Sequence, residues 1–96
     1  MNSILYTNPL YVIAKFVTIP DNITMELKQR LKNIGINIKS ERIRAGLSQE
    51  ELAEKCEISR NSISLIETGK LNPTIIKVID IAKTLNVDIN VIVKDA

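Results

Sequence analysis

The chain has 96 residues, enough for one compact domain, and its 45% hydrophobic and 25% charged residues are typical of a globular protein. Its net charge of +2 is low for a protein that binds nucleic acid, so any affinity for DNA must come from where the charges lie. The single cysteine, Cys56, excludes an internal disulfide, and the absence of histidine removes the commonest general base and the commonest metal ligand.

The beginning of the chain has the composition of a β-strand. Residues 10–19 (LYVIAKFVTI) are rich in β-branched and aromatic residues, and Pro9 and Pro20 bracket them. A single strand is not stable in water. It therefore pairs with its twin in a second subunit, as a dimerisation arm, or with residues 89–93, or else it is a loose extension. Met25 as the natural start is a further alternative.

We accordingly divide the chain into an N-terminal extension, residues 1–24, and a helical domain, residues 25–96. The apolar run is too short to cross a bilayer and does not resemble a secretion signal, so we expect a cytoplasmic protein with no membrane partner. The surplus of positive charge also lies towards this end. Residues 1–33 contain four basic and two acidic residues, whereas residues 34–96 contain nine of each.

The pattern becomes helical from Asp21. Apolar residues recur at partly helical spacing, and the stripe continues to a helix end near Ala45; its members are Met25, Leu27, Leu31, Ile34, Ile38 and Ile43. Gly35 either kinks this helix or separates it from the next. Gly46 stands where a helix end favours a residue that tolerates positive φ.

Two short helices follow. Ser48 and Glu51 form a capping box that opens a helix over about residues 49–56. Ser59 caps the next helix, which ends at residues 68–70. We expect the core to receive Leu52, Ala53 and Cys56 from the first helix and Ile63 and Ile66 from the second.

Two further elements close the chain. Thr74 caps a helix whose expected inner stripe is Ile75, Val78, Ile79, Ala82 and Leu85. Asp88 caps a last short element over residues 89–94. Its β-branched residues make helix and strand nearly equal in propensity, so both remain open.

The two short helices and the turn at residues 57–59 form a helix-turn-helix. A small residue, Ala53, permits close approach of the second helix, and Ile58 fills the corner between them. The second helix then projects its first turn, which suits the major groove of DNA. Arg60 can bond guanine and Asn61 can bond adenine, while Leu65 can touch a thymine methyl group. Side chains that can bond phosphates are those of Gln49, Ser59, Ser62 and Ser64.

Residues 36–85 resemble the phage repressor/Cro family of helix-turn-helix domains, also called Xre-like or Cro/C1-type regulators. The resemblance rests on continuous spacing over residues 38–39, 42, 46–53, 58–60, 63–64, 66–67, 69, 73–74, 81–82 and 85. It implies an all-α, five-helix, lambda-repressor-like domain that binds DNA as a symmetric dimer. Two positions depart from the family pattern: Glu57 replaces a glycine in the turn, and Leu65 replaces a residue that is often polar.

The resemblance also implies roles for particular residues. Base contacts are implied for Arg60, Asn61 and Leu65, and a role in phosphate binding and helix anchoring for Gln49. Thr68 and Lys70 match positions that touch the DNA backbone. Arg42 and Glu67 match a structural ion pair between the first and third helices of the family domain.

We therefore expect a sequence-specific regulator of transcription, acting as a repressor and as a homodimer on a palindromic operator. The alternative is an antitoxin-like protein or another interaction module whose main partner is a protein. We expect no enzyme, cofactor or metal site, because the sequence offers no phosphate loop, metal-ligand cluster or nucleophile with a base. The glutamates at 50, 51, 54 and 57 fit surface and helix-dipole positions.

Overall fold

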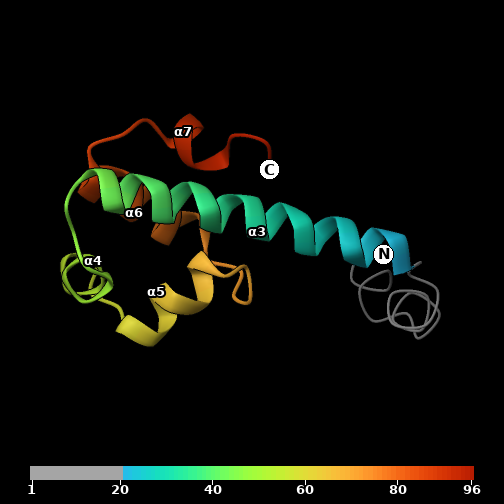
Figure 1. The fold of residues 1–96 in the computed structure, drawn as a ribbon, viewed down its shortest axis with the longest axis horizontal. Helices are drawn as coiled ribbons and strands as arrows, with labels where there is room; N and C mark the ends of the chain where they lie inside the picture. Colours follow the sequence, from blue (N-terminus) through green and yellow to red (C-terminus); the bar gives the residue numbers. More distant parts are fainter. Residues whose placement is uncertain (1–20) are drawn as a thin grey trace, which may run out of the picture.

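The computed structural model describes residues 21–96, in which five α-helices and no strands occur. The helices are α3 (Asp21–Arg44), α4 (Gln49–Lys55), α5 (Arg60–Glu67), α6 (Ile75–Leu85) and α7 (Ile89–Val93). Helix α3 runs the length of the molecule, with α4 and α5 below it and α7 above it in Figure 1. The expected all-α, five-helix domain is confirmed. The expected strand over residues 10–19 lies outside the described residues.

Helix α3 is continuous through Gly35, so the alternative of two separate helices is wrong. The glycine is needed for packing. A Cβ atom at this position would lie 2.5 Å from the carbonyl oxygen of Glu67 and would also meet that of Ile66. The absence of a side chain therefore lets α3 touch the end of α5.

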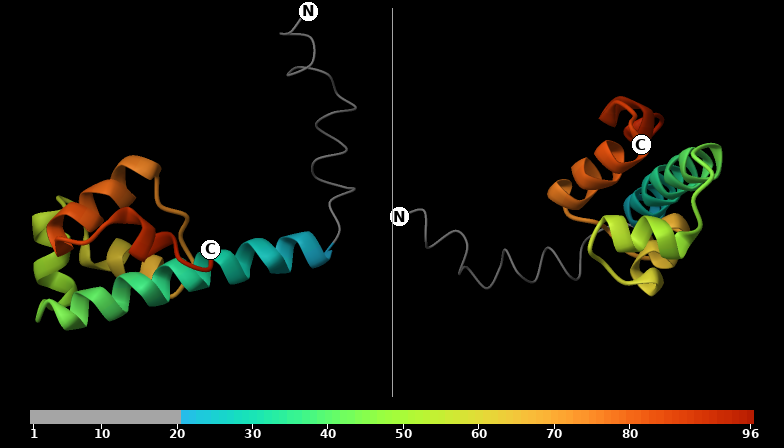
Figure 2. Two further views of the ribbon diagram at one scale, coloured as in Figure 1. Left: turned by 90° about the horizontal axis from the view of Figure 1, so that it is seen from above. Right: turned by 90° about the vertical axis from the view of Figure 1, so that its left-hand side faces the viewer.

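The apolar stripe of α3 is only partly buried. Ile38 is completely buried, but Ile43 is 59% exposed, against expectation. Five residues turn a helix by about 140° from its starting direction, so Ile43 faces away from the core that contains Ile38. Met25 and Leu27 are also exposed, because the first half of α3 extends beyond the other helices (Figure 1; Figure 2, left).

The predicted starts of the short helices are confirmed. The hydroxyl of Ser48 accepts from the backbone N–H of Glu51 at 3.0 Å, and the carboxylate of Glu51 accepts from the backbone N–H of Ser48 at 2.9 Å. Ser59 accepts from the N–H of Ser62 at 3.0 Å. The expected core residues of both helices are buried: Leu52, Ala53, Cys56, Ile63 and Ile66.

Helix α6 begins at its predicted cap, where Thr74 Oγ1 accepts from the N–H of Lys77 at 3.2 Å. Its buried face differs from the expected one. Ile75 lies in the first turn and is 62% exposed, whereas Ile81, which was not placed in the stripe, is completely buried. The buried residues are spaced by three, four and seven positions: Val78, Ile81, Ala82 and Leu85.

Residues 89–93 are helical, which resolves the alternative left open by their composition. Asp88 caps α7 by accepting from the N–H of Asn90 at 2.8 Å, and Ile92 is completely buried. Asn37 of α3 donates to the carbonyl oxygens of Ile92 and Lys94, at 2.9 and 2.8 Å. These tertiary contacts override the β propensity of the segment. Within residues 21–96 no helix has the length and apolarity needed to cross a membrane.

Candidate nucleic-acid interface

The first turn of α5 is an exposed, positively polarised surface. Arg60 and Asn61 open the helix directly after the Ser59 cap, and both are exposed to solvent. No acidic side chain occurs in this turn. The free N–H groups and the dipole at a helix N-terminus favour anions, and Arg60 adds a full positive charge. This turn is therefore suited to a polyanion with hydrogen-bonding edges.

The turn between α4 and α5 holds α5 across α4. Glu57 has a φ of 56°, and the N–H of Ile58 donates to the carbonyl oxygen of Ala53 at 3.0 Å. Ala53 is buried where the two helices meet. Glu57 thus adopts the left-handed backbone that the glycine of the family pattern accommodates freely, at a cost of about 1 kcal/mol for a residue with a Cβ atom.

A buried network of hydrogen bonds holds the end of α5 against the interior of the domain. Arg42 Nε lies 2.7 Å from Glu67 Oε2, and Arg42 Nη2 donates to Glu67 Oε1 at 3.1 Å. Arg42 Nη1 also donates to the carbonyl oxygen of Leu47 at 2.8 Å. The side chains of Arg42 and Glu67 are only 11% and 1% exposed. This bidentate pair joins α3 to the end of α5 and satisfies a carboxylate that burial would otherwise destabilise.

Gln49 belongs to the same network; a helix-anchoring role was expected for it, but its partner was not. Its Nε2 donates to Glu67 Oε1 at 3.0 Å. A carboxylate only accepts, so the amide nitrogen must face Glu67. One further amide proton and the side-chain oxygen remain for other partners, and the side chain is half-buried at the start of α4. Gln49 therefore joins α4 to α5 and retains one donor for a phosphate.

The hydroxyl groups of α5 differ in what they can still bind. Ser59 Oγ and Ser62 Oγ lie 2.8 Å apart, and either can be the donor. Whichever donates, the hydroxyl proton of the other is left for an outside acceptor. Ser62 is half-buried, as are Ser64 and Leu65 farther along the helix.

The residues expected beyond the end of α5 lie apart from its first turn. The hydroxyl of Thr68 donates to the carbonyl oxygens of Ser64 and Leu65, at 2.9 and 3.2 Å. Its proton is thus used to close the helix, and a contact with phosphate requires that hydroxyl to rotate away. Lys70 is exposed two residues later, so it offers the charge at this end.

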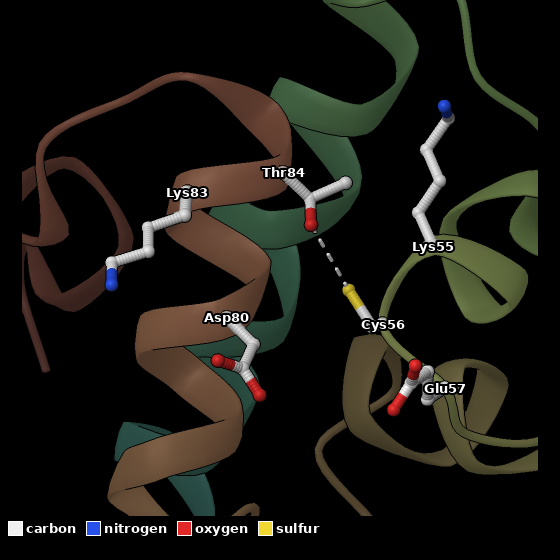
Figure 3. Close-up of a pocket in the computed structure, with 6 residues that line it drawn as sticks. All are labelled: Lys55, Cys56, Glu57, Asp80, Lys83 and Thr84. Carbon is white, nitrogen blue, oxygen red and sulfur yellow. Dashed lines mark hydrogen bonds between the residues drawn. The ribbon is translucent and has the colours of Figure 1, made fainter.

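A shallow pocket of about 270 Å³ lies between the end of α4 and α6 (Figure 3). Cys56 is buried as expected and directs its Sγ towards Thr84 Oγ1, 3.5 Å away. The remaining lining side chains carry two charges of each sign: Lys55, Glu57, Asp80 and Lys83. No group of side chains in residues 21–96 is arranged to hold a metal ion. The candidate nucleic-acid interface is therefore the first turn of α5 and not this pocket.

Glu51, in the first turn of α4, contributes to helix capping. The backbone N–H of Ser48 and then its hydroxyl are the main causes that hold the pKa of Glu51 below its ordinary value of 4.5. Both hydrogen bonds favour the ionised carboxylate. Glu51 is thus engaged in the capping box.

Comparison with known proteins agrees with this geometry. A helix-turn-helix family model matches residues 38–92, which run from within α3 into α7 and make up more than half of the chain. An HTH-type transcriptional regulator, y4dJ, of Sinorhizobium fredii is 36% identical over 56 residues, 58% of this chain and 73% of the relative. An HTH-type transcriptional regulator of Archaeoglobus fulgidus is 39% identical over 49 residues, 51% of this chain and 70% of the relative.

A solved structure is also similar. It is the restriction-modification controller protein C.AhdI from Aeromonas hydrophila, with a TM-score of 0.63 and 26% sequence identity. The similarity covers 65% of this chain and 94% of that protein.

Proposed function

Because this chain belongs to the helix-turn-helix family of DNA-binding transcriptional regulators, we propose that it is a sequence-specific repressor that binds a palindromic operator as a homodimer. The observation that carries the proposal is the exposed first turn of α5, with Arg60 and Asn61 directed away from a buried supporting network. A similar controller protein supports a regulatory role. A regulator of this kind acts on the chromosome, so we assign it to the cytoplasm.

In the proposed complex, α5 enters the major groove with its N-terminal end. Arg60 donates two hydrogen bonds to guanine O6 and N7, and Asn61 pairs with adenine N6 and N7. Leu65 is half-buried, and the exposed part of its side chain packs against a thymine methyl group. These three contacts carry the sequence preference.

Phosphate contacts position the domain without reading sequence. Gln49 donates its second amide proton. Of the two hydroxyls of Ser59 and Ser62, one donates to the other, and the hydroxyl that accepts this bond donates its own proton to a phosphate. Ser64 is a weaker candidate because it is half-buried and, unlike the equally half-buried Ser62, has no hydrogen bond to the exposed Ser59. Thr68 is weaker because its hydroxyl closes the helix. Lys70 supplies a charge at the far end of α5.

Homodimerisation gives the operator its symmetry. Two subunits that place their recognition helices about 34 Å apart meet successive major grooves on one side of the duplex. Selection of bound duplexes from random DNA tests the proposal. We expect enrichment of an inverted repeat whose half-sites are one helical turn apart, and enrichment of no sequence over bulk DNA contradicts it.

A second candidate function is supported by exposed apolar side chains outside α5. Ile75 and Ile76 of α6 are 62% and 64% exposed, which is unusual for two adjacent isoleucines. They favour a protein partner, as in an antitoxin-like regulator. Stoichiometric co-purification of a partner that is lost in an Ile75→Glu, Ile76→Glu variant supports this function, and retention of that partner contradicts the assigned surface.

A further inference from the structure

The uneven distribution of charge along the sequence has a structural counterpart on α3. Residues 34–96, which contain the whole of the matched family domain, carry nine basic and nine acidic residues, and the surplus of positive charge lies in residues 1–33. Within the described part of that segment the basic residues are Lys28, Arg30 and Lys32. Arg30 Nε donates to the carbonyl oxygen of Ala96 at 3.1 Å, which holds it against the end of the chain.

Lys28 and Lys32 lie on another side of α3. They are four residues apart, about 6 Å along the helix, and share a face with Gly35. That face touches α5, because Gly35 packs against the carbonyl groups of Ile66 and Glu67. The two lysines therefore continue, along α3, the side of the domain to which α5 belongs.

A second close contact fixes the position of Lys32. A Cβ atom on Gly69 would lie 2.8 Å from the Cα atom of Lys32 and 2.9 Å from its nitrogen. Gly69 has a φ of +74° and belongs to the turn that follows α5. Lys32 is thus fixed beside the turn that leads directly to Lys70, the residue already assigned to phosphate.

Both lysines are exposed, and neither forms an ion pair with another residue of the described chain. A basic side chain that lies beside a DNA-binding turn and has no acidic partner among the described residues attracts the phosphate backbone. We propose that Lys28 and Lys32 form a second phosphate-binding strip, which extends the DNA footprint along α3 beyond the helix-turn-helix. This inference rests on the proposed DNA-binding function. Both lysines precede residue 38, so the strip lies outside the matched family model.

The test is the salt dependence of DNA binding by the full chain. Dissociation constants are measured between 50 and 200 mM salt for the selected operator and for a random duplex of the same length. The dissociation constant at 200 mM salt is divided by the constant at 50 mM salt. Each lost phosphate contact reduces this ratio roughly 3.5-fold. We expect that reduction for Lys28→Gln and for Lys32→Gln, a roughly 12-fold reduction for the double variant, and recovery in Lys32→Arg.

Lys83→Gln is the matched control, because it removes the same charge from α6, at the pocket beside Cys56. It should leave the salt dependence unchanged. The strip is contradicted if the double variant keeps the wild-type salt dependence, if Lys83→Gln lowers it equally, or if only operator binding weakens. Failure of the wild-type chain to bind any duplex overturns the proposed function, and the strip with it. If the wild-type chain binds its operator and the double variant keeps the wild-type salt dependence, only the proposed strip is overturned.

Discussion

Gln49, the first residue of α4, donates its side-chain amide to Glu67, the last residue of α5, across 3.0 Å. The same carboxylate accepts two hydrogen bonds from Arg42 of α3. One buried carboxylate therefore joins three helices behind the surface that we assign to DNA. Helix α5 is only eight residues long, so these bonds at its last residue help to fix its orientation relative to α3 and α4.

Glu67→Ala should destabilise the fold by about 3–5 kcal/mol, because it leaves the guanidinium of Arg42 buried without its partner. Urea unfolding measures this change. Arg42→Met with Glu67→Leu should recover most of the loss, because an apolar pair of similar size removes both charges. A single substitution that costs less than about 1 kcal/mol, within the range of a surface ion pair, would contradict the buried network.

Gln49→Ala separates the two roles of this residue. It removes a hydrogen bond to a charged group, so we expect a loss of about 1.5–3 kcal/mol in the free energy of unfolding. DNA affinity should fall for all sequences alike, because the lost contact is to phosphate. If the variant weakens DNA binding without any change in unfolding by urea, the bond to Glu67 is not important in solution.

Glu57→Gly should stabilise the protein by about 0.5–1 kcal/mol, because glycine adopts a φ of 56° without the steric cost of a Cβ atom. Thermal unfolding detects this gain. Glu57→Ala is the control, since alanine removes the carboxylate but keeps the Cβ atom, and it should bring no such gain. Equal stabilisation by both variants would show that charge, rather than backbone conformation, is the cause.

Gly35→Ala should destabilise the fold by about 1–3 kcal/mol, because the added methyl group meets the backbone of α5. Gly46→Ala is a useful comparison. A Cβ atom there meets nothing within 4 Å, so only its φ of +75° opposes the change. Denaturant unfolding of both variants separates the two causes, and an unchanged stability in Gly35→Ala would contradict the close approach of α3 and α5.

The pH dependence of stability should report the capping box. The pKa of Glu51 is lowered in the folded state, first by the backbone N–H of Ser48. The resulting stabilisation is present above the ordinary value of 4.5 and is lost as the pH falls through the lower, folded value. Glu51→Gln should therefore flatten the acid side of the stability profile. An unaltered profile below that pH would contradict this role.

Local chemistry made the helix starts predictable. Ser48 with Glu51, Ser59 and Thr74 each cap the helix that the sequence assigns to them, because a cap is determined by neighbouring residues. The helical state of residues 89–93 was not predictable in this way. It depends on burial of Ile92 and on a bond from Asn37, 55 residues away.

Burial was harder to predict than helix position. Ile43 and Ile75 were both placed on the expected apolar faces, yet both are exposed, because Ile43 lies on the side of α3 away from Ile38 and Ile75 lies in the first turn of α6. The residues assigned to DNA contact came from a resemblance and from side-chain chemistry. The bond between Gln49 and Glu67 could not be predicted from the sequence, because only the fold brings the start of α4 beside the end of α5.

The central claim is that the first turn of α5 reads bases, and the sequence preference of Arg60→Ala tests it most directly. Affinities are measured on the selected operator and on duplexes with every single-base change, beside wild type and Lys70→Ala. We expect Arg60→Ala to cost roughly 1–3 kcal/mol in binding free energy on the operator and to lose discrimination at one base pair, whereas Lys70→Ala should weaken binding to all duplexes equally. Retention of the full wild-type preference by Arg60→Ala would contradict the account.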